Sequence, residues 1–244
     1  MTDSVVPAGE PLSQVERVVD VFVAPSKTFT DILRSTSWWM PLIILAVCSL
    51  FFSYAVDKKV GFDAVAQQQL EKMPAQAEQV DAMAPADKAR VIHQRAVGTK
   101  YTTYGFTVFI MIFVLIHTLL LWASANFGLG AKTKFSQVFA VVMYAGLPKI
   151  FISLIGSALL FADVGIDGFD VQNPVGTNIG YFLSSPALKA AGSFLDVFGL
   201  WSLALLVLGI AIISGKSKTQ AAILVVGWWV VGLLLSAGVA AAFS

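Results

Sequence analysis

The stretch YGFTVFIMIFVLIHTLLLWASANF, residues 104–127, decides the fold of this chain. The hydrocarbon core of a bilayer is about 30 Å thick, so a helix that crosses it needs about 20 mostly apolar residues. The stretch has this length, and His117 is its only side chain that can carry charge near neutral pH. It therefore predicts a helix that crosses a membrane.

Four further stretches of the same character lie on both sides of it in the chain. They are residues 38–56, 138–161, 197–213 and 221–243, and Lys149 is the only charged residue within them. The chain is 57% hydrophobic and 13% charged, with a mean hydropathy of +0.78, whereas soluble domains carry about 25% charged residues. We therefore expect an all-α polytopic membrane protein with five transmembrane helices.

The remaining composition excludes several functional classes. The net charge of +1 provides no general attraction for nucleic acid. Cys48 is the only cysteine and lies in the first apolar stretch, so neither a disulfide framework nor a cysteine metal site is expected. The chain has no HExxH, G-x-S-x-G, P-loop or dinucleotide-binding motif. We expect no catalytic residues, no metal and no cofactor.

The segment before the first span has two parts. Residues 1–12 contain Pro7, Gly9 and Pro11 and predict a disordered tail. Residues 13–37 have apolar residues at helical spacing, interrupted by Pro25, which predicts two short amphipathic helices on the cytoplasmic side. The pattern from Thr28 to Asp31 fits a capping box that would start the second helix. These helices either bind lipid or a partner, or pack on the mouth of the bundle.

Residues 38–243 form the predicted five-span domain, which contains two long external loops. The loop 57–103 is rich in Gln, Ala, Glu and Lys and is broken by Pro74 and Pro85, so helical fragments are expected over 64–73, 75–83 and 87–97. It either contacts a partner or is a solvated connector. The loop 162–196 has turn formers from Gly165 to Gly180, and then a short helix over 186–195.

The distribution of basic residues near the span ends predicts the orientation. The amino-terminal segment contains Arg17, Lys27 and Arg34, and the two short links contain Lys132, Lys134, Lys216 and Lys218. The loop 162–196 has only Lys189. This places the amino terminus in the cytoplasm and the carboxyl terminus outside. The loop 57–103 argues the opposite way, because it is also rich in lysine and arginine. We give more weight to the short links, since tight hairpins have few alternatives.

Ionisable residues at membrane depth are the candidate binding residues. Lys149 follows Pro148 in the third stretch, where a proline kink frees a backbone carbonyl. Its ammonium group either binds a lipid phosphate, a substrate anion or a partner carboxylate, or snorkels to the interface or pairs within the bundle. Asp196 is the nearest candidate acid. His117 either relays protons or hydrogen-bonds a neighbouring helix.

Small residues recur every fourth position on the last span, at Gly232, Ser236 and Ala240. In lipid, small residues let two helices approach closely. We expect this row to serve contacts within the bundle, with a seam between two copies of the chain as the alternative.

Three sets of residues resemble a known family. They are LDVFGLWS at 195–202 continuing to Gly209, with the basic link and Trp228-Trp229 after it; PSKTF at 25–29 with Ile32; and YAGLP at 144–148. In order and spacing they are similar to the bacterial branch of the Yip-one (Ypt/Rab-interacting protein, YIP) family of five-span proteins. The resemblance covers most of residues 15–243 and implies a compact five-helix bundle with a cytoplasmic amino terminus.

The resemblance implies a non-catalytic component of an inner (plasma) membrane. Eukaryotic relatives act in vesicle trafficking and contact small GTPases, which is not carried over because a bacterial cell lacks such traffic. Pro148, Asp196 and Trp201 carry the pattern and serve either binding or structure. We expect a scaffold or accessory protein that binds the lipid bilayer and another membrane protein or a second copy. The alternative is a small transporter, channel or lipid-translocating protein that uses the kink at Pro148 and Lys149.

Overall fold

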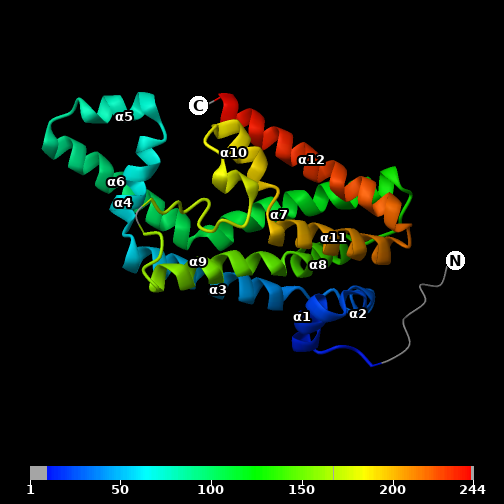
Figure 1. Cartoon of the computed structure of the whole chain (residues 1–244). Coiled ribbons are helices and arrows are strands. Elements are labelled where there is room, and N and C mark those ends of the chain that lie inside the picture. Colours follow the sequence, from blue (N-terminus) through cyan, green and yellow to red (C-terminus); the bar gives the residue numbers. More distant parts are fainter. Residues whose placement is uncertain (1–9, 167, 243–244) are drawn as a thin grey trace.

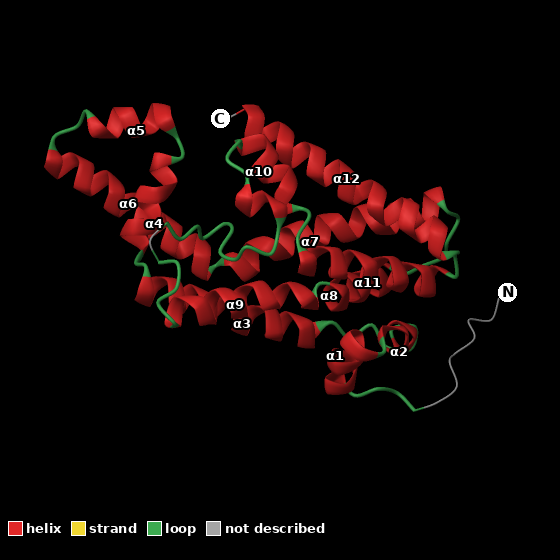
Figure 2. Cartoon of the chain, viewed as in Figure 1, coloured by secondary structure: helices red, strands yellow, loops and turns green. Residues whose placement is uncertain are grey.

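The computed structural model describes residues 10–166 and 168–242. Within them the chain is helical, and the β-type pairing is limited to an isolated bridge between Asn178 and Asp196 (Figure 2). Five helical segments are long and apolar enough to cross a membrane, which confirms the predicted fold class. They are Trp39–Lys59 (α3), Phe106–Gly128 (α7 and η1), Phe135–Phe161 (α8 and α9), Val197–Ser214 (α11) and Lys218–Ala242 (α12). In the second of them, α7 covers Phe106–Ala123 and is followed by the π-helical turn η1, Ser124–Gly128.

Two short helices precede the first span, as the sequence predicts: α1 (Gln14–Val23) and α2 (Pro25–Asp31). A capping box starts α1, because the Ser13 hydroxyl accepts from the Glu16 amide and the Glu16 carboxylate accepts from the Ser13 amide. The capping box predicted from Thr28 to Asp31 is wrong. The helix α2 already begins at Pro25, whose fixed φ suits a first turn. The predicted tail over 1–12 falls mostly on residues 1–9, outside the described part.

The third span is built from α8 (Phe135–Ala145), a 3₁₀ turn η2 (Leu147–Lys149) and α9 (Ile150–Phe161). Its two halves have different neighbours. The helix α9 packs against α3, whereas α8 packs against α11 (Figure 1). The rings of Phe151 and Phe198 lie 5.4 Å apart, so α11 begins level with the middle of the third span. The first and fourth spans are therefore staggered in depth.

Because of this stagger, α8 and α11 extend beyond α3 at one end of the bundle. The short helices α1 and α2 pack there, α1 against α8 and α2 against α11 (Figure 1). They contribute the fully buried Val21, Phe29 and Ile32 to the main core, together with Tyr144 of α8 and Ile210 of α11. They are thus part of the bundle rather than a separate appendage.

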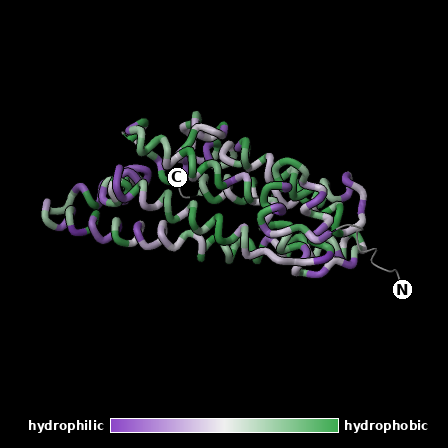
Figure 3. The backbone as a smooth tube through the Cα atoms, turned by 90° about the horizontal axis from the view of Figure 1, so that it is seen from below, coloured by the Kyte–Doolittle hydropathy of each residue, from purple (hydrophilic) through white to green (hydrophobic). Residues whose placement is uncertain are grey.

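At the opposite end three helices form an arm: α4 (Phe62–Glu71), α5 (Pro74–Asp81) and α6 (Pro85–Tyr104). The predicted helical fragments are confirmed, although α6 runs further and ends directly before the second span. Buried residues of the arm, among them Val65 and Ala96, join Val56 of α3 and Leu160 of α9 in a second core cluster. Hydrophilic residues gather toward this arm end and toward the amino-terminal end, with hydrophobic helices between them (Figure 3).

The loop 162–196 returns from the arm end to the middle of the bundle. It contains a 3₁₀ turn η3 (Ile179–Phe182) and the helix α10 (Pro186–Ser193), which packs along α12. Gly180 and Gly192 let these two elements touch, because a Cβ on Gly180 would lie 2.3 Å from the Lys189 carbonyl oxygen. The loop then ends at Asp196, at the first turn of α11.

Candidate functional site in the middle of the spans

Lys149 lies where the third span is interrupted. Pro148 has no amide hydrogen to donate, and the chain makes the tighter turn η2 there, with the Lys149 amide donating to the Gly146 carbonyl at 3.1 Å. Pro148 is buried, but the Lys149 side chain is exposed. Its ammonium group makes no ion pair or hydrogen bond with any residue in the described part of the chain. A cation so placed at membrane depth is costly unless a ligand or partner covers it.

The structure brings two other predicted residues near Lys149. Asp196, at the start of the fourth span, lies close enough for its charge to act on the Lys149 ammonium group. Lys149 in turn acts on His117, a half-buried residue of the second span. We call these three residues the mid-span cluster; the charge of Lys149 acts on His117 and that of Asp196 on Lys149, and no hydrogen bond or ion pair joins them within the described residues.

Asp196 is also a structural residue. One carboxylate oxygen accepts from the Gly199 amide at 2.9 Å and caps α11, and the other accepts from the Thr177 hydroxyl. The Val197 amide donates to the Thr177 carbonyl at 3.1 Å. Both carboxylate oxygens thus hold the loop to the first turn of α11. The negative charge of the carboxylate also acts on the Lys149 ammonium group.

Ser202 is a residue that the sequence argument missed. It is 6% exposed, and its hydroxyl has no hydrogen-bond partner in the described residues. Other hydroxyls in the spans donate to the carbonyl one turn earlier, for example Ser53 to Ser49 and Ser157 to Ser153. Ser202 lies one turn of α11 beyond Phe198, which packs against Phe151 near the level of Lys149.

Trp201 packs between α1 and the third span, and its predicted binding role stays a prediction. Its ring lies 5.6 Å from that of Phe22 in α1 and 6.4 Å from that of Phe151 in α9. Phe22 and Phe151 also meet, at 5.8 Å. This aromatic group joins the amino-terminal helices to the third and fourth spans.

A buried polar network, also missed from the sequence, fixes α1 to α2. The Arg17 and Asp31 side chains are 1% and 5% exposed, and a guanidinium nitrogen of Arg17 lies 2.7 Å from a carboxylate oxygen of Asp31. Arg17 also donates to the Ser35 carbonyl at 2.9 Å, and the Thr28 hydroxyl donates to the Arg17 carbonyl. The only signal in the sequence was a single arginine within an apolar helical pattern.

A close helix approach fixes the same unit to the spans. Gly209 of α11 faces Phe29 of α2 and Val141 of α8, and a Cβ added to it would lie 2.5 Å from a Val141 methyl. The Tyr144 hydroxyl donates to the Gln14 side chain at 3.0 Å. The motifs around Phe29, Tyr144 and Gly209 therefore meet at one contact, the docking contact.

The small residues on the last span are partly accounted for by α10. An added Cβ at Gly232 would lie 3.4 Å from the Phe194 ring, which also packs on Trp229 at 6.2 Å. Ser236 and Ala240 are half-buried. The contact at Gly232 lies within the bundle, and the use of the whole row stays a prediction.

Comparison with known proteins gives one match. The model of the Yip1 domain matches residues 19–239, which include α2, the docking contact and all five candidate spans up to the last turn of α12. No curated protein and no solved structure matches the chain. Because the match covers most of the sequence, the chain belongs to the Yip1 domain family.

Proposed function

We propose that this membrane protein is a non-enzymatic scaffold or accessory component that acts by binding a partner protein or lipid. The supporting observation is a row of valines that α1 turns outward, away from the docking contact: Val15, Val19 and Val23, which are 63%, 52% and 73% exposed. Exposed apolar rows of this kind mark surfaces that another molecule covers. The short basic links favour a cytoplasmic position for this row in the inner (plasma) membrane.

The docking contact supports the proposal because it holds the row in place. The buried Arg17–Asp31 pair and the fit of Phe29 over Gly209 leave α1 little freedom relative to the spans. A surface fixed in this way can bind without first losing conformational entropy. The residues that resemble the family lie at this contact. This favours a role that family members share, in which the contact holds α1 ready to bind another molecule.

The test is photo-cross-linking in native membranes. A photoreactive residue at Val19 is expected to give a reproducible adduct with one membrane protein or one lipid class. Val21 on the same helix is 0% exposed, and Val108 on the second span is 71% exposed, so they serve as buried and bilayer-facing controls. If Val19 gives only the adducts of Val108, and gentle solubilisation yields the protein alone and free of lipid, the proposal is wrong.

A second candidate function is a small transporter, channel or lipid-translocating protein. The observation that favours it is the mid-span cluster, in which the exposed Lys149 ammonium group has no bound partner within the described residues. In liposomes, flux or lipid flip-flop that Lys149→Ala abolishes and Lys189→Ala leaves intact would support it. Absence of flux from the wild-type protein would overturn it.

A further inference from the structure

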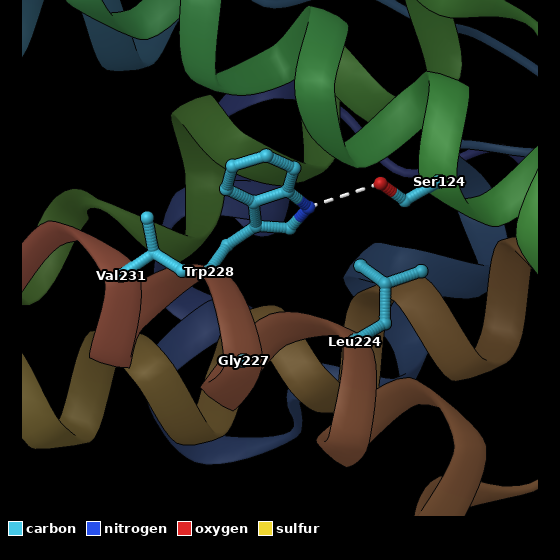
Figure 4. A pocket seen from close by; sticks show the side chains of 5 residues that line it. All are labelled: Ser124, Leu224, Gly227, Trp228 and Val231. Carbon is cyan, nitrogen blue, oxygen red and sulfur yellow. Dashed lines mark hydrogen bonds between the residues drawn. The ribbon is translucent and has the colours of Figure 1, made fainter.

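A notch opens between the second and fifth spans near the amino-terminal end of the bundle. It has a volume of about 320 Å³ and is lined by Ser124, Leu224, Gly227, Trp228 and Val231 (Figure 4). The Trp228 indole donates to the Ser124 hydroxyl at 3.0 Å, so the polar atoms of these two side chains satisfy each other. What the notch offers to an occupant is therefore almost entirely apolar.

Two local features of the backbone lie at the notch. The second span ends in the π-helical turn η1, a rare geometry that is frequent at functional sites. On α12, Gly227 has no side chain, and a Cβ added there would meet nothing within 4 Å. Both spans expose apolar side chains around it, such as Ile223 at 70% and Phe127 at 83%, so the bilayer surrounds the notch.

Lysines lie in and next to the two short links, at the same end of the bundle as the notch. These lysines are Lys132, Lys134, Lys216 and Lys218, and none of them forms an ion pair within residues 10–166 and 168–242. The arm end differs, because Lys59 pairs with Asp163 at 2.7 Å and Lys72 with Asp170 at 2.9 Å. Lys218 precedes Leu224 by about 9 Å along α12, since a helix rises 1.5 Å per residue.

We propose that the notch and these lysines form a binding site for an anionic phospholipid in the leaflet at the amino-terminal end. One acyl chain occupies the notch beside Gly227 and Trp228, and the phosphate is bound by the ammonium groups of Lys216 and Lys218. The apolar lining excludes a charged peptide, and the unpaired lysines select an anion. A phospholipid is the amphiphile that the surrounding bilayer supplies.

The two parts of the site have different roles. Lipid chains gain no hydrophobic energy by moving from the bilayer to an apolar notch. The notch therefore determines where the acyl chain lies. The lysines determine the headgroup preference, because basic residues at a membrane surface attract anionic lipids. The site lies on helices other than α1 and does not depend on the function proposed above.

The test is native mass spectrometry of the full chain released from bilayers of phosphatidylglycerol and phosphatidylcholine. The wild-type protein is expected to retain phosphatidylglycerol preferentially. The double variant Lys216→Gln/Lys218→Gln should lower that preference roughly tenfold. The double variant Lys58→Gln/Lys88→Gln, at the arm end, serves as its control. Equal preference in these three proteins overturns the proposal.

The notch is tested by filling it. Gly227→Leu should reduce the retained phosphatidylglycerol several-fold, while Gly238→Leu, on the same helix and also in open space, should leave it unchanged. If Gly227→Leu retains as much lipid as Gly238→Leu, the chain does not occupy the notch and the proposal is overturned. Excess inorganic phosphate should leave the lipid in place. Complete displacement would mean that the lysines alone hold the lipid, which contradicts the role proposed for the notch.

A measurement on the wild-type protein covers the case in which Gly227→Leu fails to fold. Phosphatidylglycerol with a photoreactive acyl chain should label residues 224–231 of α12 and the turn η1 more strongly than phosphatidylcholine with the same chain. Equal labelling by the two lipids overturns the proposal even if cross-linking at Val19 succeeds.

Discussion

The amino-terminal pair α1–α2 and the arm α4–α6 are both helical pieces outside the spans, and both pack on the bundle. Their ion pairs differ in environment. In the pair, Arg17 and Asp31 are almost completely buried. In the arm, Lys88 and Asp81 are 40% and 64% exposed. Lys100 of the arm and Asp57 of α3, which form an ion pair between them, are 49% and 31% exposed. Water and salt reach the second kind of pair but not the first.

This difference predicts how tightly each piece is held. Breaking a buried ion pair leaves an uncompensated charge and costs about 3–5 kcal/mol, whereas an exposed pair contributes about 0–1 kcal/mol. The pair α1–α2 should therefore stay docked until the bundle unfolds. The arm should loosen first, and its position should respond to salt and acid.

The largest effect is expected from Asp31→Asn, which leaves the Arg17 guanidinium buried without its counter-charge. We expect a loss of about 3–5 kcal/mol in the free energy of unfolding, measured by thermal unfolding in detergent or nanodiscs. Asp87→Asn in the arm is the control, since its ion pair with Arg90 is exposed. If the two variants are equally stable, the buried pair does not hold the docking contact.

A smaller loss is expected from Gly209→Ala at the docking contact. The added methyl would lie 2.5 Å from a Val141 methyl and 3.1 Å from the Phe29 ring, and overpacking of this kind costs about 1–3 kcal/mol. Val141→Ala should recover part of the loss in a double-mutant cycle. Gly98→Ala in α6 is the matched control, because a Cβ there meets nothing within 4 Å. Additive effects of Gly209→Ala and Val141→Ala would contradict the proposed clash.

The smallest effect is a pH dependence of the arm. Lys72, at the end of α4, ties the arm to Asp170 in the loop 162–196, and Lys189 of α10 pairs with the same carboxylate. Burial acts to raise the pKa of the Asp170 carboxyl, but hydrogen bonds from these two ammonium groups outweigh it and hold the pKa below the usual 3.8. The contribution to stability is therefore present above the unfolded-state pKa and is lost as the pH falls through the folded-state pKa. Because Lys72 is 46% exposed, we expect less than about 1 kcal/mol.

Limited proteolysis of the arm measures this contact. Cleavage within residues 62–104 should increase below pH 3.8, and Asp170→Asn should show the faster cleavage already at neutral pH. Cleavage between α1 and α2 should not change in either case. An arm whose cleavage rate is the same at both pH values would show that Asp170 does not hold it.

The spans and the arm helices were predictable because their signals are local. Apolar length identifies the spans, and Pro74 and Pro85 separate the arm helices. The docking of α1–α2 was not predictable, because Arg17 looks like an ordinary basic residue before a span and its partner appears only in the fold. Likewise, the close approach at Gly209 depends on Phe29 and Val141, which are distant in sequence.

The mid-span cluster was predictable in its members but not in its arrangement. Lys149 and His117 stood out as ionisable residues within apolar stretches, and Asp196 as the nearest acid. Apolar length does not show that α11 begins beside the middle of the third span, which is what brings Asp196 within electrostatic range of Lys149. The unpartnered hydroxyl of Ser202 had no signal, because serine is common in spans and is usually satisfied by its own helix.

The start of α11 beside the middle of the third span has a consequence for biogenesis. Irregular backbone at membrane depth is tolerated only where protein surrounds it, and the segment from α10 to Asp196 is covered by α12. A helix that is synthesised after this segment thus shields it. This part of the bundle can be completed only after synthesis of the chain has reached α12, so nascent chains shorter than this should stay open on that side.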